Sequence, residues 1–545
     1  MKNNSNFKIL WRLLDLVKPL WPVMALAIIL GSAGQLAASF VTINAVAAAG
    51  KIFSGQTASA LIVLLLICAF SRGILHYGEH YCNHLLAFKM LALIRVKVFH
   101  KLRLLSPAKL EGKDKGDLLS LITSDIELLE VFYAHTISPI AIACVYTICL
   151  LVFFARYSLA CALLALIFYA LAGIGIPLIF SRFSSRPGQD IRQKMGQISN
   201  FMLDSILGLA ESLQYGQGDK RKKELAATDQ DLTQSRAKLN QLTALQQTLT
   251  NLVILLATTS MLLLTSRILH LPFSQSLITA SAMLASFGPV SALSALSTGL
   301  TETVASARRV LAILDEEPVV EENAAGGKPA FSSASLEKVT FTYPDGGRPV
   351  LADYSLTIPK GKIIGIHAPS GSGKSTILKL LARFYDVQKG QVAISAVNIK
   401  DIETSALRGL ESYMPQETWL ATDTVENNIK LGKAASREEV VACAKMANIH
   451  DFIMTLPKGY DSLLGENGNS LSAGQKQRIG IARAFLHGGE LLLLDEITAN
   501  LDALNEGIIL KALKEARSGK TVVLVSHRLS TLAIADQIIA LPSRE

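Results

Sequence analysis

Residues 362–376 read KIIGIHAPSGSGKST, and this stretch decides what fold the C-terminal half of the chain is expected to have. The apolar run 362–367 predicts a buried strand, and a helix is predicted to follow from Ser375. Between them lies APSGSGK, a turn of glycines and short side chains. Backbone N–H groups in such a turn, at the start of a helix, bind phosphate groups. The stretch therefore predicts a nucleotide-binding α/β domain.

The turn resembles a P-loop. In that motif Lys374 would reach the β- and γ-phosphates of ATP, and the Ser375 hydroxyl would hold Mg²⁺. Ala368 stands where the first glycine of the motif belongs, and a glycine-rich turn that binds nothing is the alternative. The residues expected to contact ATP here are Ser370, Gly371, Ser372, Gly373, Lys374, Ser375 and Thr376.

Three further segments predict groups for ATP hydrolysis. LLLLDE, residues 491–496, is a buried strand that ends in two carboxylates, of which Asp495 would bind Mg²⁺ and Glu496 would polarise the attacking water. VVLVSHR, residues 522–528, brings His527 to the end of another buried strand. YMPQ supplies Gln416, expected near the Mg²⁺ and the reacting groups. Each segment alone has an ordinary alternative, namely a core strand for LLLLDE, a strand-end histidine for His527 and a surface amide for Gln416.

Three more segments predict contacts to ATP. LSAGQKQR, residues 471–478, places Ser472, Gly474 and Gln475 at the start of a helix, which suits an anion. ANLD, residues 499–502, contributes Asp502. Tyr343, after the strand VTFTY, could stack on adenine, or could be an ordinary aromatic residue of a strand.

The composition of the whole chain indicates a membrane protein. Of its 545 residues, 50% are hydrophobic and only 18% are charged, below the roughly 25% of soluble domains. A disordered chain is excluded. The six cysteines form no C-x-x-C pair, so neither a disulfide framework nor a zinc site is expected.

Long apolar runs predict six membrane spans, because a spanning helix needs about 20 apolar residues. They are Pro19–Gly50, Ala58–Phe88, Val131–Ala155, Tyr157–Ser181, Leu239–Ser266 and Ile268–Thr301. The second contains Arg72 and Glu79, two turns apart on one face, which lie either in the bundle interior or near the membrane interface.

Charge between the spans predicts their orientation. Residues 89–130 hold eight Lys or Arg and residues 182–238 hold ten, so both long loops and both termini are expected in the cytoplasm. This bias accounts for much of the net charge of +9, and no nucleic acid is expected as a partner. Residues Phe7 to Lys18 predict an amphipathic helix along the inner leaflet.

The expected organisation is a membrane α-helical bundle followed by an α/β ATPase domain. Residues 1–314 form the six-helix membrane domain, 315–333 a linker rich in Gly, Pro and Ala, and 334–545 the nucleotide-binding domain. Both cytoplasmic loops are expected to continue the membrane helices, with short breaks at Leu105 to Asp125 and at Ser205 to Gly218.

Taken in this order, the motifs resemble an ABC transporter half of the exporter type, with LSAGQ as the signature and Glu466 in the segment before it. The resemblance implies an ATPase that drives transport, with ATP and Mg²⁺, in a bacterial inner membrane. It also implies a dimer, in which each ATP lies between the P-loop of one domain and the signature of another. The two breaks would be coupling helices.

Residues 76–91, 102–140 and 485–496 resemble the CydC subunit of the CydC/CydD type in particular. This likeness implies a haem or reduced-thiol substrate and a non-identical, CydD-like partner. It also implies haem binding by His84. An exporter of lipids, drugs or peptides is an alternative, and an ATP-gated channel or membrane sensor is another.

Several features depart from the pattern or stay open. Ala473 replaces the first glycine of the signature, and the chain stops soon after the strand QIIAL, which we expect to make the domain shortened or dependent on its partner. His76, His80 and His84 form one slowly winding stripe on the second span. Histidines of this kind either bind a ligand or lie at the outer interface and bind nothing.

Overall fold

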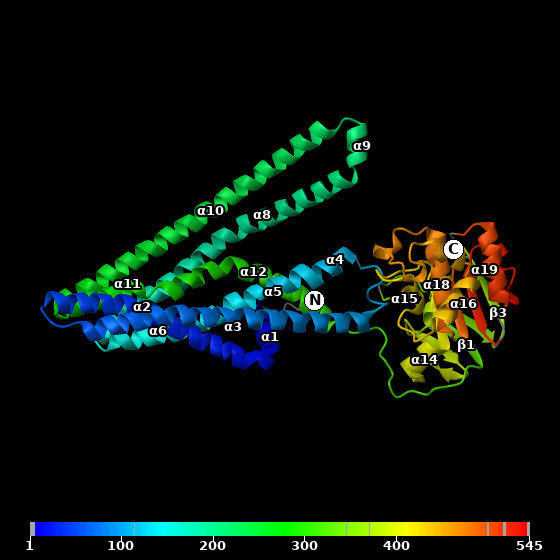
Figure 1. Cartoon of the computed structure of the whole chain (residues 1–545), viewed down its shortest axis with the longest axis horizontal. Coiled ribbons are helices and arrows are strands. Elements are labelled where there is room, and N and C mark those ends of the chain that lie inside the picture. The colour runs from blue at the N-terminus through cyan, green and yellow to red at the C-terminus, as the bar shows by residue number, and fades with distance from the viewer. Residues whose placement is uncertain are drawn as a thin grey trace. The chain divides into compact units, whose positions relative to one another are not determined.

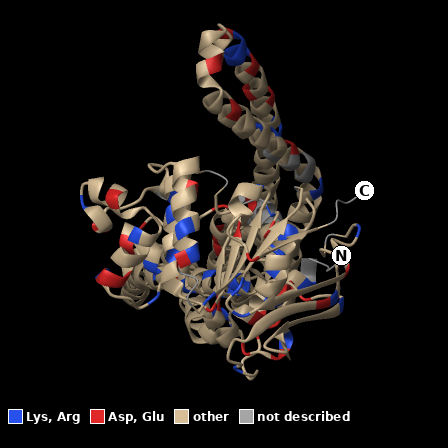
Figure 2. Ribbon diagram, turned by 90° about the vertical axis from the view of Figure 1, so that its right-hand side faces the viewer, with Lys and Arg blue, Asp and Glu red and all other residues tan. Residues whose placement is uncertain are grey.

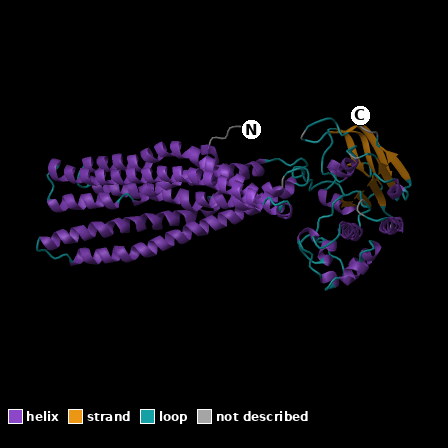
Figure 3. Cartoon of the chain, turned by 90° about the horizontal axis from the view of Figure 1, so that it is seen from above, coloured by secondary structure: helices purple, strands orange, loops and turns teal. Residues whose placement is uncertain are grey.

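The computed structural model describes residues 6–113, 115–344, 346–369, 371–498, 501–515 and 519–541. They form two compact units: residues up to 104 with 113–316, and residues 105–112 with 317–541. The first unit contains the long helices. The second unit contains the described strands together with shorter helices (Figure 3).

The first unit is a bundle of long helices. Its α-helices are α1 (Asn6–Leu16), α2 (Trp21–Phe53), α3 (Ser59–Leu105), α4 (Lys115–Ser120), α5 (Ile126–Phe132), α6 (Ser138–Ala155), α7 (Leu159–Ala170), α8 (Ile176–Leu207), α9 (Leu209–Gln214), α10 (Gly218–Leu263), α11 (Phe273–Ala285) and α12 (Gly288–Asp315). A 3₁₀ turn, η1 (Lys18–Leu20), precedes α2, and π-helical segments η2 (Leu121–Asp125), η3 (Tyr133–Ile137), η4 (Leu171–Gly175) and η5 (Leu264–Ile268) interrupt the others.

Within the described residues, six helical stretches are long and apolar enough to cross a membrane. They run Lys18–Phe53, Ser59–Leu105, Gly116–Ala155, Leu159–Ser184, Gly218–Ile268 and Phe273–Leu293, and each overlaps one predicted span. No residue in the apolar window of the second stretch is buried within the chain.

The expected bounds of the sixth span were wrong. Ile268 ends the π segment η5, and α11 begins only at Phe273. The cause is local, because His270 has a φ of 51° and Pro272 cannot continue the preceding helix. A further break at Ser286 and Phe287 separates α11 from α12 within the predicted span.

Both predicted cytoplasmic breaks are present. Helix α8 ends at Leu207, the short helix α9 crosses over, and α10 returns beside α8 (Figure 1). Lys, Arg, Asp and Glu gather at the tip of this hairpin (Figure 2). With 46 residues, α10 is roughly 69 Å long, against about 30 Å for the hydrocarbon core. The hairpin therefore extends well beyond a bilayer.

Ion pairs hold α12 to the N-terminal part of the first unit. Arg12 of α1 donates two hydrogen bonds of 2.6 Å to Asp315 at the end of α12. Asp125, 1% exposed, accepts from Arg309 and, at 2.9 Å, from Ser306. Helix α1 is amphipathic as predicted, with Ile9 and Leu13 buried one turn apart.

The second unit contains two sheets. One has the order β2-β1-β4-β5, and the other, which is parallel, has the order β6-β7-β8-β3-β9. The strands are β1 (Ser333–Phe341), β2 (Leu351–Pro359), β3 (Ile363–His367), β4 (Lys389–Ile394), β5 (Val397–Asn398), β6 (Glu411–Met414), β7 (Leu491–Asp495), β8 (Thr521–Ser526) and β9 (Gln537–Ala540). Strands β7 and β8 are buried along their whole length, as expected for a parallel sheet covered on both faces.

Helices connect and cover these strands. They are α13 (Lys374–Leu381), α14 (Thr404–Leu410), α15 (Val425–Lys430), α16 (Arg437–Met446), α17 (His450–Thr455), α18 (Ala473–His487), α19 (Ala503–Glu515) and α20 (Leu529–Leu532). Short 3₁₀ turns are η6 (Ile399–Asp401), η7 (Gly459–Asp461) and η8 (Glu466–Gly468).

A short segment of the expected membrane domain belongs to the second unit. Residues 105–112 lie in the expected membrane domain by sequence, but they pack with the second unit. The Tyr385 hydroxyl donates to the Ala108 carbonyl at 3.3 Å and to Glu111 at 3.0 Å, and Lys379 pairs with Glu111.

Candidate functional site

The parallel sheet brings the predicted motifs to one edge. Ligands bind beyond the carboxyl ends of the strands in open α/β sheets. The turn 368–373 follows β3, Gln416 follows β6, Glu496 follows β7 and His527 follows β8. Because β6, β7, β8 and β3 are consecutive strands of this sheet, the four segments that follow them meet at this edge although they are far apart in sequence.

The turn after β3 has the backbone that phosphate binding requires. Gly371 and Gly373 have φ of 80° and 96°, which glycine adopts without strain. Lys374 is 6% exposed, and its ammonium donates to the carbonyls of Ala368 and Pro369, each at 2.8 Å. Ala368 keeps the turn in this form although it replaces a glycine. Ser370 lies outside the described residues.

Two residues fit a Mg²⁺ ion at this edge. Asp495 is 3% exposed, and its Oδ1 has no hydrogen-bond partner among the described atoms. Burial raises the pKa of the Asp495 carboxyl, while a hydrogen bond from Ser375 opposes this shift. A buried carboxylate with a free oxygen beside a hydroxyl is the oxygen donor set that Mg²⁺ prefers.

Glu496 is held between two other predicted residues. The Gln416 amide donates to Glu496 Oε2 at 3.1 Å, and His527 Nδ1 lies 3.3 Å from Oε1. Glu496 has a φ of 47°, an uncommon conformation for a residue with a side chain. The carboxylate thus lies at the sheet edge with a donor on either side.

Sequence reasoning missed Gln477. Its side chain is 2% exposed and its amide donates to the Glu496 backbone carbonyl at 3.0 Å. The residue lies inside the segment LSAGQKQR, but nothing in the spacing indicated that it turns inward from α18. It ties the signature helix to the end of β7.

Tyr343 does not extend freely from the end of β1. Its hydroxyl lies 2.9 Å from the Thr376 hydroxyl, and its ring packs edge-on against Tyr385 with centroids 5.1 Å apart. Lys379 Nζ lies 5.9 Å from the ring centroid. Tyr343 is therefore placed beside the phosphate-binding turn, through its contact with α13.

The signature opens α18 as predicted. Ser472 is the N-cap, its Oγ accepts from the Gln475 backbone at 3.2 Å, and the Gln475 side chain accepts from the Ser472 backbone at 2.8 Å. Gly474 lies in the first turn, and Ala473 adopts helical geometry there without requiring a positive φ. The side chain of Glu466 lies outside the described residues.

Asp502 fixes the start of α19. Its carboxylate accepts from the Asn505 backbone at 2.9 Å and from the Asn505 side chain at 2.6 Å. The backbone hydrogen bond from Asn505 is the main cause of a lowered pKa at Asp502. Arg478 of the signature helix donates to Asn505 at 3.1 Å, which links Asp502 to α18.

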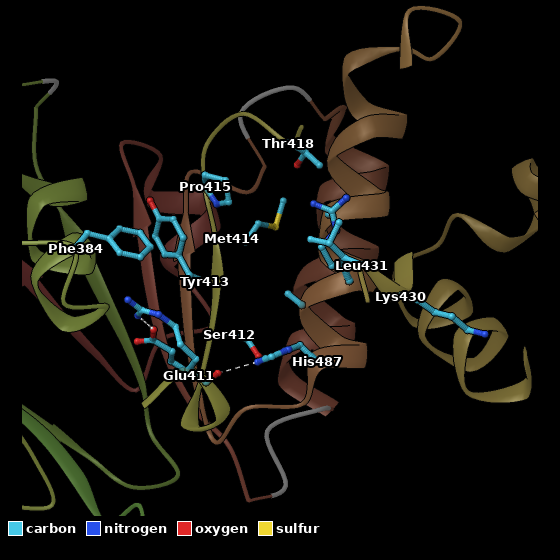
Figure 4. Close-up of a pocket in the computed structure, with 14 residues that line it drawn as sticks. Phe384, Glu411, Ser412, Tyr413, Met414, Pro415, Thr418, Lys430, Leu431 and His487 are labelled. Carbon is cyan, nitrogen blue, oxygen red and sulfur yellow. Dashed lines mark hydrogen bonds and ion pairs between the residues drawn. The ribbon is translucent and has the colours of Figure 1, made fainter. Parts of the chain in front are cut away.

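A pocket of about 380 Å³ lies between β6, α15 and α18 (Figure 4). Glu411 on its wall is 4% exposed, pairs with Arg408 and leaves Oε2 without a partner among the described atoms. Burial raises the pKa of Glu411 to about 7, although Arg408 acts against the shift. The lining combines apolar and cationic side chains, namely Phe384, Tyr413, Met414, Leu431, Arg408, Lys430, Arg483 and His487.

The histidine stripe lies on α3 as predicted. Ring centroids of His76 and His80 are 4.4 Å apart, and those of His80 and His84 are 6.2 Å apart. His84 Nδ1 lies 3.4 Å from Glu130, and its ring lies 5.6 Å from that of His135. In the described residues no group of three or more His, Cys, Asp or Glu could hold a metal ion.

The intramembrane acid of the second span is also placed. Glu79 has a side chain only 12% exposed, and its Oε2 lies 3.2 Å from His76 Nδ1. A Cβ added to Gly31 of α2 would lie 2.9 Å from its carboxyl carbon. Glu79 therefore faces the bundle interior rather than the interface.

Comparison with known proteins places both units in one family. Residues 351–499 match the family described as ABC transporter, and residues 21–290 match the ABC transporter transmembrane region. A probable ABC transporter ATP-binding/permease protein of Haemophilus influenzae is 41% identical over 99% of both chains.

Two further similarities concern transport. An ATP-dependent lipid A-core flippase of Haemophilus influenzae is 30% identical, covering 87% of this chain and 82% of the flippase. The solved structure of a bacterial Atm1-family ABC exporter with ATP bound has a TM-score of 0.80 at 25% identity, covering 95% of this chain and 92% of that one. The expected likeness to CydC has no support in these comparisons.

Proposed function

Because the chain belongs to the ABC transporter family, we propose that it is one half of an ATP-driven exporter of amphipathic, lipid-like molecules. It is an ATPase coupled to transport and a multi-pass protein of the inner membrane, with the ATPase domain in the cytoplasm. The observation that carries the ATPase part is Glu496, held between Gln416 and His527.

The geometry supports a division of work in ATP hydrolysis. Ser375 and Asp495 would hold Mg²⁺, which would supply positive charge to the phosphates. Lys374, now bonded to two carbonyls of its own turn, exchanges them for phosphate oxygens. Glu496 orients the attacking water, and His527 lies next to it, where the γ-phosphate would be.

We propose that the complete site needs a second half-transporter. Ser472 is exposed at the start of α18, and the resemblance to ABC transporters implies a contact between Ser472 and ATP held by another domain. Ala473 at the first signature glycine favours a non-identical, CydD-like partner, since paired unequal sites tolerate one altered signature. The relatives compared carry no such name.

We propose that α9 docks in the pocket of the other half. Leu209 and Leu213 of α9 are 54% and 69% exposed, although both are large apolar residues. The pocket offers an apolar wall with cations around it, and α9 offers Glu211 and a helix C-terminus. This contact would transmit closure of the ATPase domains to α8 and α10.

The substrate class rests on two observations. The first is that one relative is named as a flippase of lipid A-core. The second is that α3 of this chain presents an apolar surface that the chain itself does not cover. The test is ATP-driven movement of a fluorescent lipid across proteoliposomes that contain the full chain and its partner half. We expect movement and lipid-stimulated ATPase activity, both lost in Glu496→Gln. ATP hydrolysis without net movement would favour a channel or sensor.

Haem is a second candidate substrate, favoured by the two imidazoles of His84 and His135 on different elements. Their rings approach in a tertiary contact, and His84 is only partly covered, with 41% of its side chain exposed. Haem added to the purified protein should give a Soret band that is weaker in His84→Ala and unchanged in His270→Ala. Identical spectra and affinity in all three proteins would exclude haem at His84.

A further inference from the structure

Three buried side chains from three segments meet behind the catalytic edge. The Thr498 hydroxyl lies 3.2 Å from Glu506 Oε1 and 2.9 Å from the Thr531 hydroxyl, and Thr531 donates to Glu506 Oε1 at 2.5 Å. Thr498 is 1% exposed, Thr531 0% and Glu506 8%. Glu506 lies in the first turn of α19. The three oxygens form a closed triangle.

Each member of the triangle belongs to a segment that carries part of the site. Thr498 is two residues beyond Glu496, and Thr531 is four residues beyond His527. Arg528, next to His527, lies with its guanidinium 3.8 Å from the second oxygen of Glu506. Glu506 therefore contacts both the segment of Glu496 and the segment of His527.

Backbone hydrogen bonds join the segment of Glu496 to the segment of His527 only up to the ends of β7 and β8. The ladder between β7 and β8 ends with Asp495 opposite Val525, and the Glu496 N–H donates to the Val525 carbonyl at 3.0 Å. Beyond that point the Glu506 carboxylate supplies side-chain contacts to both. A buried carboxylate is costly without hydrogen bonds, so the triangle forms as a unit or not at all.

We infer that Glu506, with Thr498 and Thr531, is a positioning residue for ATP hydrolysis: it fixes the separation of Glu496 and His527. Glu506 is not among the residues that we assign to ATP or to Mg²⁺, and it acts through the segments of Glu496 and His527. Its effect is on the 3.3 Å contact between His527 and Glu496, and so on whether both reach the same γ-phosphate. The inference rests on the ATPase activity of the proposed function and adds to it a set of residues outside the recognised motifs.

The experiment compares variants of Thr531 in the full chain, purified together with its partner half in lipid nanodiscs. Thr531→Val keeps the shape but removes the hydroxyl, and Thr531→Ser keeps the hydroxyl. We expect Thr531→Val to lower kcat on the order of tenfold with KM for ATP nearly unchanged, because a small misplacement of reacting groups is costly. Thr531→Ser should restore most of kcat.

Thr521→Val is the matched control. Thr521 is also a fully buried threonine, whose hydroxyl accepts from the Gly361 backbone at 2.9 Å, but it lies at the start of β8, at the opposite end of that strand from Ser526. The Thr521→Val variant should have a lower free energy of unfolding but an unchanged kcat per ATP-binding site. Equal kcat in Thr531→Val and Thr521→Val would overturn the inference, as would equal loss in Thr531→Val and Thr531→Ser.

A second pair covers the case in which Thr531→Val does not fold. Glu506→Gln keeps an acceptor oxygen and should retain more kcat than Glu506→Ala, and the loss in Glu506→Gln should not add to that in Thr498→Val. Additive losses would contradict a shared unit. Absence of ATPase activity in the wild-type complex of both halves would contradict the proposed function instead, so the two failures are distinguishable.

Discussion

Glu496 combines an unusual backbone conformation with a demanding position. Its φ of 47° places it in a region that costs side-chain-bearing residues stability and that persists where surrounding contacts impose it. Those contacts come from Gln477 on its carbonyl, Val525 on its N–H, and Gln416 and His527 on its carboxylate. The strand β7 alone would not aim this carboxylate at the sheet edge.

Exchanging this one carboxylate should separate hydrolysis from binding. Glu496→Gln is expected to lower ATP turnover at least about a hundredfold, because the amide cannot act on the attacking water. ATP affinity should stay near that of the wild type. Lys374→Ala should instead weaken binding, measured by a fluorescent ATP analogue. Near-normal turnover in Glu496→Gln would place the active chemistry in the partner's site.

Glu411 predicts a pH dependence of stability. Its pKa is raised from 4.5 to about 7 in the folded state, so the folded protein holds a proton that the unfolded chain has lost. The contribution is fully present below pH 4.5 and disappears as the pH rises through about 7, at a slope of up to about 1.4 kcal/mol per pH unit. Thermal unfolding at pH 5 and pH 7.5 should show this loss in the wild type and a smaller one in Glu411→Gln. Equal pH dependence in both proteins would refute it.

At the scale of elements, local sequence was most informative where a motif coincided with a helix or strand end. Ser472 and Gln475 could be recognised because a capping box needs only residues three apart, and β3, β7 and β8 because buried parallel strands are continuous apolar runs. Gln477 and the triangle of Thr498, Glu506 and Thr531 could not, since each depends on a partner at least eight residues away. The break between α11 and α12 was missed because the run of uncharged residues continues across it.

Two capping boxes in the second unit allow a controlled test of the signature. Ser472 caps α18, and Ser436 caps α16 with the same pair of hydrogen bonds. Either substitution by Ala should lower stability by about 1 kcal/mol. Only Ser472→Ala should also raise the ATP concentration needed for half-maximal hydrolysis. An equal rise in Ser436→Ala would mean that the effect comes from helix fraying.

Docking of α9 in the pocket can be tested by cross-linking. Leu431→Cys, in a chain without its native cysteines, should form a disulfide with a cysteine introduced into the corresponding short cytoplasmic helix of the partner half when ATP closes the dimer. Leu504→Cys with the same partner cysteine is the matched control, because Leu504 is 75% exposed on α19 and does not line the pocket. Equal cross-linking in both pairs would show random collision.

At the scale of the whole molecule, composition and spacing were sufficient for six spans and an ATPase domain, and insufficient for partner and substrate. Spans are predicted from hydropathy, which depends on single helices. A partner is recognised by surfaces such as the exposed face of α3. An apolar sequence does not tell which face of its helix the rest of the chain leaves uncovered. His84 shows the same limit, because its neighbours Glu130 and His135 come from a different helix.

The composition of the active assembly can be measured directly. In the complex with the partner half, Glu496→Gln with ATP should trap a closed dimer of ATPase domains, visible in native mass spectrometry as the mass of this chain plus that of one partner chain. If a non-identical partner is required, this chain purified alone should hydrolyse ATP far more slowly than the complex isolated with its partner. Full activity of an assembly that contains only this chain would refute the heterodimer.

The packing of residues 105–112 with the ATPase unit has a consequence for biogenesis. Glu111 and Tyr385 are 274 positions apart, and ribosomes add about 5–20 residues per second, so Glu111 is made roughly 15–55 s before its neighbour. During that interval the first piece of the ATPase unit is already delivered beside a newly inserted membrane helix, with its final contacts not yet synthesised. Membrane insertion therefore comes before completion of the ATPase domain. A substitution at Pro107 or Ala108 should impair this late assembly step as well as transport.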